Sequence, residues 1–155
     1  PNTPSLLQAG ITALYPNAEV SEDQCSTAES ILRAGGSVIW VDDERLMDTV
    51  TALSGSGPAY FFRMMEAMEE AGVQRGLPRE QARLLVIETA LGAARMALES
   101  EDDPGTLRRN VTSRGGTTAA ALATFDEGGL AELVDRAVGA AADRAGELGD
   151  QLGGE

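Results

Sequence analysis

The chain has no histidine, no lysine and a single cysteine, Cys25, among its 155 residues. Without histidine it cannot form a Ser-His-Asp triad, a histidine-ligated zinc site or an imidazole switch near neutral pH. One cysteine cannot form an internal disulfide or a thiolate metal site, so we expect no metal and an inert Cys25. This cysteine usage favours a reducing, cytoplasmic compartment.

Positive charge is also scarce, because 12 basic residues stand against 25 acidic ones and the net charge is −13. This balance argues against binding to nucleic acid, which needs a basic face, and against docking on an anionic membrane. No stretch is apolar enough to span a membrane, since Arg83, Glu88 and Arg95 interrupt the most apolar helix candidate, Gln81 to Leu98. Hydrophobic residues make up 43% of the chain, which is enough for a folded core.

Residues 1–53 have the pattern of a mixed α/β segment. The expected elements are a strand from Leu6 to Tyr15, a helix that Ser21 and Gln24 begin with a capping box, a buried strand at Val38-Ile39-Trp40-Val41, and a helix capped by Asp42 or Asp43. Two strands are too few for a complete dinucleotide-binding sheet, so we interpret residues 1–53 as the end of a truncated α/β domain. The opening Pro1-Asn2-Thr3-Pro4 has the character of the interior of a longer protein, and we expect the chain to be a fragment.

Residues 54–155 predict an all-helical domain, so the fold class is mainly α with a short α/β part in front. The expected helices run from Ser54-Gly55-Ser56-Gly57-Pro58 to Gly76, from Arg79 to Ser100, from Asp103-Pro104 to Asn110, from Thr117 to about Phe125, and from Leu130 to Leu148. The helix Arg79 to Ser100 is apolar on most of its sides, which predicts burial that a second subunit must supply. The ending Gly153-Gly154-Glu155 is expected to fray.

The first candidate site is Ser113-Arg114-Gly115-Gly116-Thr117-Thr118. Two glycines before a helix let the backbone approach a ligand, and the free N–H groups of the helix start point at an anion. Hydroxyl groups of Ser113, Thr117 and Thr118 can add hydrogen bonds, so the segment suits a carboxylate or a phosphate. The alternative is an ordinary helix start with no ligand.

The second candidate is the loop Ser54-Gly55-Ser56-Gly57, which also leads into a helix. It can bring backbone groups close to a phosphate or an amide, although it is not a dinucleotide fingerprint and lacks the lysine of a P-loop. The alternative is a flexible hinge between the α/β part and the helices.

The third candidate is Glu101-Asp102-Asp103 in front of Pro104. Neighbouring carboxylates perform acid–base chemistry where burial raises one pKa. The alternative is a solvated helix junction in which Asp103 is the N-cap, and we favour this interpretation for Asp102 and Asp103.

Two of these segments resemble one known family. The stretch Thr51-Ala52-Leu53-Ser54-Gly55-Ser56-Gly57-Pro58-Ala59-Tyr60 is similar to a segment of Δ1-pyrroline-5-carboxylate reductases, and residues 107–122 resemble the signature of that family. Pro1-Asn2-Thr3-Pro4, Gly76-Leu77-Pro78 and Glu99-Ser100 also match, so the resemblance is collinear over nearly the whole chain. It implies that residues 1–53 end a Rossmann domain and that residues 54–155 form a helical dimerisation and substrate-binding domain of the 6-phosphogluconate dehydrogenase C-terminal type.

The resemblance also implies an activity, the NAD(P)H-dependent reduction of pyrroline-5-carboxylate to L-proline, the last step of proline synthesis. The carboxylate of pyrroline-5-carboxylate would meet the segment Ser113 to Thr118, chiefly Ser113, Gly115, Gly116 and Thr117. The ring nitrogen of this substrate would meet Thr118, the expected catalytic residue. Glu101 would support the substrate. By the same resemblance, Ser54, Gly55, Ser56 and Gly57 and the segment Asn110-Val111-Thr112 would lie beside NADPH or NADH. Most of the cofactor domain is absent from this chain, so we expect the fragment to be inactive alone and to form a homodimer or a larger oligomer.

One residue departs from the family pattern, and two other functions remain alternatives. Arg114 stands where the family usually has proline, which frees the backbone of the turn and adds a cation near an anion site. A sister dehydrogenase of the β-hydroxyacid type usually depends on a lysine in its helical domain, and this chain has none. A non-catalytic helical dimerisation module is the other alternative, because the cofactor fingerprint is missing.

Overall fold

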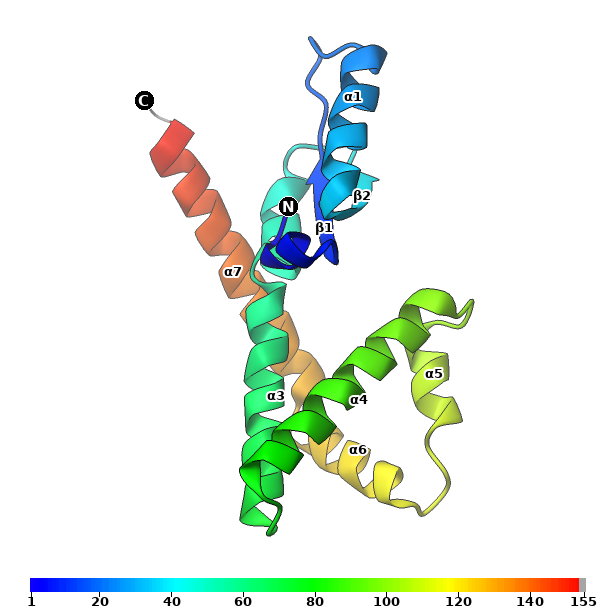
Figure 1. Cartoon of the computed structure of the whole chain (residues 1–155). Coiled ribbons are helices and arrows are strands. Elements are labelled where there is room, and N and C mark those ends of the chain that lie inside the picture. Colours follow the sequence, from blue (N-terminus) through cyan, green and yellow to red (C-terminus); the bar gives the residue numbers. More distant parts are fainter. Residues whose placement is uncertain (154–155) are drawn as a thin grey trace. The chain divides into compact units, whose positions relative to one another are not determined.

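The computed structural model describes residues 1–153, which are mainly helical (Figure 1). They form two compact units, of which one contains Pro1–Tyr60 with the chain from Val134 onward and the other is Phe61–Leu133. The mainly helical class with a short α/β part at the start is confirmed. The domain boundary after Leu53 stays a prediction. The predicted fraying of the C-terminus falls largely on residues 154 and 155, outside the described part of the chain.

The α/β part has two parallel strands, β1 (Gly10–Leu14) and β2 (Gly36–Trp40), which helix α1 (Glu22–Leu32) connects. Figure 1 shows α1 next to the two strands. Gly10 pairs with Gly36 at the start of the ladder, and Gly36 has a φ of 139°. A side chain at Gly36 would collide with the carbonyl of Gly10, so glycine is required where the strands begin to pair.

The predicted capping box at the start of α1 is confirmed. Ser21 accepts a hydrogen bond from the Gln24 N–H at 3.3 Å, and the Gln24 side chain accepts one from the Ser21 N–H at 2.9 Å. Further along the helix, Glu29 accepts a hydrogen bond from the indole of Trp40 on β2 at 2.7 Å, and it pairs with Arg33. The Trp40 bond and then the Arg33 guanidinium lower the pKa of Glu29. A charged contact therefore joins α1 to β2.

Two predictions for this part were wrong in detail. Leu6 and Leu7 belong to a 3-10 helix, η1 (Thr3–Leu7), and the strand begins only at Gly10, because a proline in the first turn favours helix over strand. The second strand is not buried within this chain, since Ile39 is 44% and Trp40 38% exposed. Parallel sheets are normally covered on both faces, and two strands with one connecting helix do not provide that cover.

The helix after β2 also differs from its prediction. Helix α2 (Leu46–Val50) begins after Arg45, while Asp43 accepts a hydrogen bond from the Arg45 N–H at 2.9 Å and lies outside the helix. The chain then forms a π-helical turn, η3 (Thr51–Gly55), and passes into α3 (Gly57–Gln74). The glycine-rich loop predicted here was wrong, because the backbone stays helical through it.

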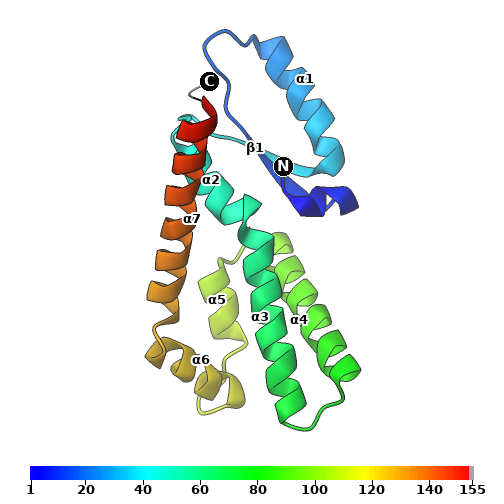
Figure 2. The same ribbon diagram turned by 90° about the vertical axis from the view of Figure 1, so that its left-hand side faces the viewer.

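The remaining helices agree with the sequence pattern. They are α4 (Arg79–Glu99), α5 (Pro104–Asn110), α6 (Thr117–Glu127) and α7 (Leu130–Gly153). Figure 2 shows α3 and α4 as an antiparallel pair that a short turn connects. Gly76 makes this turn with a φ of 98°, and Pro78 precedes the first residue of α4.

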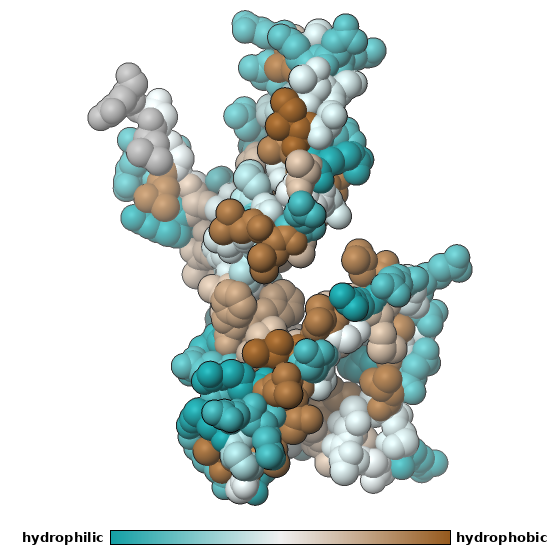
Figure 3. All heavy atoms as spheres, in the orientation of Figure 1, coloured by the Kyte–Doolittle hydropathy of each residue, from teal (hydrophilic) through white to brown (hydrophobic). Residues whose placement is uncertain are grey.

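Helix α4 exposes most of the apolar side chains that the sequence predicts to be buried. Leu98 is 82% exposed, Leu84 62% and Leu85 57%, whereas Ala82 is buried. Figure 3 shows apolar side chains gathered on the surface along α3 and α4. An apolar helix in water is unfavourable, so this surface favours cover by another chain. Among the described residues, no helix is long and apolar enough to cross a membrane.

Candidate functional site: the start of α6 and the end of α5

The backbone before α6 forms a tight turn that exposes the start of the helix. Gly115 has a φ of 72°, in the left-handed region that glycine adopts most readily, and Gly116 is the N-cap of α6. The Gly116 N–H donates to the carbonyl of Ser113 at 3.1 Å, which closes the turn. The first hydrogen bond beyond the cap runs from the Ala120 N–H to the Gly116 carbonyl at 3.2 Å.

The N–H groups of Thr117, Thr118 and Ala119 precede that first bond, so they have no partner within the helix. The first turn of α6 carries no acidic side chain, and the helix dipole adds positive potential there. Thr118 is half-buried and Thr117 is exposed. Such an arrangement binds a small anion through its amides and offers one partly sheltered hydroxyl beside it.

Ser113 lies close to this helix start. A side chain at Gly116 would collide with the hydroxyl of Ser113, so this hydroxyl lies next to the N-cap residue. Arg114 is exposed next to it. The structure therefore brings Ser113, Gly115, Gly116, Thr117 and Thr118 together, as their adjacency in the sequence requires.

The end of α5 carries the second group of candidate residues. The Thr112 hydroxyl donates to the Arg108 carbonyl at 2.6 Å, and the Thr112 N–H donates to the Arg109 carbonyl at 3.0 Å. Thr112 thus satisfies carbonyls at the end of the helix. The Asn110 amide donates to the Asp102 carboxylate at 3.5 Å, and Val111 is 58% exposed. Asn110, Val111 and Thr112 belong to the same compact unit as the start of α6.

The carboxylates in front of α5 are explained by capping. Asp103 accepts hydrogen bonds from the Thr106 N–H at 3.1 Å and from the Thr106 hydroxyl at 2.7 Å. These bonds lower the pKa of Asp103, whereas a general acid at neutral pH needs a raised pKa. The N-cap interpretation of Asp103 is confirmed, and the lowered pKa disfavours Asp103 as a general acid. Glu101 is exposed in the same segment.

The third group, Ser54 to Gly57, lies in the other compact unit. Ser54 and Gly55 belong to the π-helical turn η3, while Gly57 is buried and begins α3. The Ser54 hydroxyl donates to the Val50 carbonyl at 2.9 Å, so it is engaged within the helix. The segment itself is helical, and the alternative of a flexible hinge stays a prediction.

Two features were not anticipated from the sequence. The first is that the Asn2 side chain hydrogen-bonds to Ser54 and to Ile11. The sequence does hint at the Ser54 bond, because Pro58 has no N–H with which to pair the carbonyl of Ser54, four residues earlier. The other feature is a set of ion pairs between α3 and α4, where Glu69 pairs with Arg79 and with Arg83.

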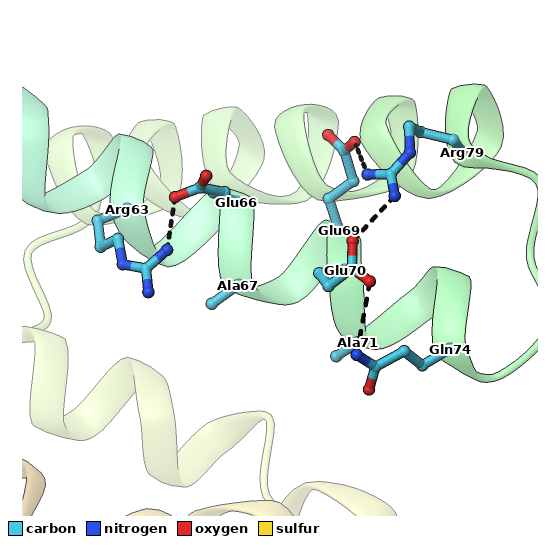
Figure 4. A pocket seen from close by; sticks show the side chains of 8 residues that line it. All are labelled: Arg63, Glu66, Ala67, Glu69, Glu70, Ala71, Gln74 and Arg79. Atoms are coloured by element: carbon cyan, nitrogen blue, oxygen red, sulfur yellow. Dashed lines mark hydrogen bonds and ion pairs between the residues drawn. The ribbon is translucent and has the colours of Figure 1, made fainter.

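Figure 4 shows the ion pair of Glu69 with Arg79. Glu69, Glu70 and Arg79 line a cavity of about 340 Å³. Arg79 also pairs with Glu70 at 2.9 Å. Hydrogen bonds from Arg83 and Arg79 lower the pKa of Glu69, and Arg79 lowers that of Glu70. These carboxylates and guanidinium groups bind one another, so their ion pairs link α3 to α4.

The fold defines a class of protein, a helical domain preceded by a short α/β part. A family model described as pyrroline-5-carboxylate reductase dimerisation matches residues 44–148. The chain belongs to the pyrroline-5-carboxylate reductase family.

Individual relatives agree with this assignment. The pyrroline-5-carboxylate reductase of Pseudomonas aeruginosa is 54% identical over 153 residues, which are 99% of this chain and 56% of the relative. A solved reductase structure from Coxiella burnetii is 53% identical with a TM-score of 0.93, and the match covers 96% of this chain and 55% of that one. The Plasmodium falciparum enzyme, solved with NADP bound, is 33% identical with a TM-score of 0.88 over 96% of this chain and 61% of that one. The chain spans about half the length of the curated relatives it matches.

Proposed function

We propose that this chain is the dimerisation and substrate-binding part of a reductase that converts 1-pyrroline-5-carboxylate to L-proline with NAD(P)H. The family assignment supports this proposal, and the start of α6 is the observation that carries it. We use the term whole reductase for a full-length enzyme that contains this chain and a part equivalent to the portion of the relatives that this chain does not match. A cytoplasmic location is proposed with it, on the evidence of the single cysteine.

The start of α6 fits the substrate. Pyrroline-5-carboxylate carries one carboxylate, which the N–H groups of the first helical turn can bind, with the Ser113 hydroxyl beside them. Thr118 is the proposed catalytic residue, because this residue is half-buried and its hydroxyl can hydrogen-bond the ring nitrogen while that nitrogen gains its proton. An ordinary threonine is a weak acid, so we assign Thr118 to orientation and to relay of a proton from water. Glu101 is proposed to support the bound substrate.

The described residues fit part of a nicotinamide cofactor. No glycine-rich turn follows β1 or β2, where the chain continues as Tyr15-Pro16 and Val41-Asp42, so they offer no site for a pyrophosphate. The exposed ends of α5 and η3 do offer backbone and side-chain polar groups, and we propose that Asn110, Val111 and Thr112 and the segment Ser54 to Gly57 contact NADPH or NADH. When bound, the nicotinamide supplies the hydride.

The exposed apolar surface of α3 and α4 supports a homodimer through the helical domain. We propose residues 54–155 as the dimerisation and substrate-binding domain and residues 1–53 as the end of a Rossmann domain. Large side chains such as Phe61, at 69% exposure, and Leu84 are the ones that a partner would cover. Sedimentation of the whole reductase at micromolar concentration is expected to show no monomer, and a stable folded monomer would contradict this assembly.

A non-catalytic dimerisation module is the second candidate, because this chain lacks a dinucleotide fingerprint. A β-hydroxyacid dehydrogenase is disfavoured by the absence of lysine. The test is NAD(P)H oxidation with pyrroline-5-carboxylate by the whole reductase and, separately, by this chain alone. We expect turnover by the first and none by the second. An inactive whole reductase would favour the module, and turnover by the isolated chain would show that the cofactor site is misplaced.

A further inference from the structure

The side chain of Asn2 connects two segments that are far apart in the sequence. Its Nδ2 donates to the carbonyl of Ser54 at 3.0 Å, and its Oδ1 accepts from the N–H of Ile11 at 3.0 Å. Asn2 also stands at the N-cap of η1, where asparagine commonly bonds to its own helix, yet it makes no such bond. The oxygen of the Asn2 amide therefore bonds to β1, and its nitrogen bonds to the π-helical turn η3.

The carbonyl of Ser54 needs an outside donor because of Pro58. In a continuous helix this carbonyl would accept from the N–H four residues later, and proline has none. The next residue, Ala59, donates its N–H to the Ser56 carbonyl at 3.0 Å. Asn2 supplies the missing donor to a residue that is half-buried, where an unpaired carbonyl is unfavourable.

The turn that Asn2 holds has an unusual geometry. The Ser56 N–H reaches the Thr51 carbonyl at 2.9 Å, which is the five-residue spacing of a π-helix, and Ala52 inside the turn is fully buried. Single π-helical turns are often found at functional sites, where they aim backbone groups that a regular helix would hide. The backbone after the turn is the segment Ser54 to Gly57.

We propose that Asn2 is a positioning residue, which fixes η3 against β1 and so sets the backbone of Ser54 to Gly57 for the nicotinamide cofactor. This role rests on the proposed function. Asn2 acts through η3, so its loss changes how tightly the cofactor is held more than it changes the chemical step. The KM for NADPH, compared with kcat, is therefore the quantity that reports it.

The test is Asn2→Asp in the whole reductase. Aspartate keeps the oxygen that accepts from Ile11 and loses the donor to Ser54, which isolates one of the two bonds. We expect the KM for NADPH to rise about fivefold, the effect of one hydrogen bond, with kcat within about twofold. The matched control is Asn17→Asp, because Asn17 only accepts a bond from the Glu19 N–H at 3.1 Å on an exposed turn. This control makes the same charge change and is expected to leave the KM unaltered.

A second substitution separates positioning from general damage. Pro58→Ala restores a backbone N–H four residues after Ser54, so the double variant Asn2→Asp with Pro58→Ala should recover a KM within about twofold of Pro58→Ala alone. A KM that is unchanged in Asn2→Asp, or raised equally in Asn17→Asp, overturns the role of Asn2. A rise that Pro58→Ala fails to reduce also overturns it.

The proposed function and this inference fail in different ways. If the unsubstituted whole reductase shows no turnover, the proposed function is wrong, and the cofactor role of Asn2 is wrong with it. If turnover is normal and the KM does not respond to Asn2→Asp, only the inference is wrong. Amide hydrogen exchange over residues 51–60 of the whole reductase reads the hold on η3 separately. Faster exchange in Asn2→Asp than in Asn17→Asp supports that hold, and equal exchange contradicts it.

Discussion

The segment leading into α3 and the segment leading into α6 both carry glycines and hydroxyl side chains, yet only the second leaves the helical backbone. Before α6, Gly115 takes a positive φ and the chain turns. Before α3, helix α2 precedes the glycines directly, and the backbone continues through η3. The comparison teaches that glycine permits a break without enforcing one, and that the structure of the preceding residues decides.

The two segments also differ in what holds them. One neutral hydrogen bond from the Asn2 amide holds the first, and the Ser54 hydroxyl in it donates to the Val50 carbonyl. The second follows α5, whose start is capped by the charged carboxylate of Asp103. Its amides at the start of α6 remain available to a ligand. The four predictions below test this contrast between a segment held in place and a segment open to substrate.

The largest effect is expected for Thr118→Ala in the whole reductase. Loss of one preorganised hydrogen bond to the ring nitrogen should weaken the transition-state stabilisation that kcat/KM measures by about 2–4 kcal/mol. The affinity for NADPH should stay within about twofold. Steady-state kinetics with pyrroline-5-carboxylate measure it. The matched control is Thr124→Ala in the same helix, where the hydroxyl donates to the Ala120 carbonyl at 3.2 Å. Normal kinetics with a lowered Tm in Thr118→Ala would show that Thr118 only stabilises the helix start.

The second prediction compares one substitution at both segments. Gly115→Ala forces alanine to a φ of 72° and should lower the free energy of unfolding by about 1–2 kcal/mol. Gly55→Ala lies in η3 without a positive φ, and its added carbon would meet Thr51 at an ordinary 3.6 Å. It should be neutral or stabilise by about 0.5–1 kcal/mol. Urea unfolding of the whole reductase decides, and a destabilised Gly55→Ala would contradict the continuous helix.

The third prediction concerns Gly116→Ala. The added carbon would meet the Ser113 hydroxyl, which can rotate away, and would lie 3.2 Å from the Ser113 carbonyl oxygen, so stability should fall by about 1 kcal/mol. The same carbon narrows the approach of a carboxylate to the helix amides, and the KM for pyrroline-5-carboxylate should rise severalfold with a smaller change in kcat. Gly139→Ala in α7, which has open space around it, is the control. An unchanged KM would remove the carboxylate from this helix start.

The smallest effect is a difference in pH dependence. The pKa of Asp103 lies below its ordinary value of 3.8, so its cap contributes stability above that value and loses it as the pH falls further. Asp103→Asn keeps a capping side chain that does not titrate, and its Tm should decline less between about pH 4 and pH 2. Thermal unfolding across this range measures the difference, with the exposed Asp135→Asn as the charge control. Parallel curves for all three proteins would contradict the charged cap.

Features that depend on neighbouring residues were predictable from the sequence. The capping box of Ser21 and Gln24 and the cap of Asp103 act over three residues, so their patterns were sufficient. The π-helical turn was not predicted, and its contact with Asn2 joins residues that lie 52 positions apart, which no local pattern reveals. The exposure of β2 was missed because burial depends on what covers a sheet. At the candidate site the turn geometry followed from the glycines, whereas the roles of Thr118 and Asn110 came from the family resemblance and stay predictions.

The indole of Trp40 makes the contact between β2 and α1 visible by spectroscopy. This chain has one tryptophan, so all of its indole fluorescence comes from Trp40, whose indole N–H donates to Glu29. The tryptophan emission of the chain therefore reports the state of the α/β part and does not directly report the helices around α6. Protonation of Glu29 in acid removes the charge from that bond, which gives the α/β part an optical signal of its own.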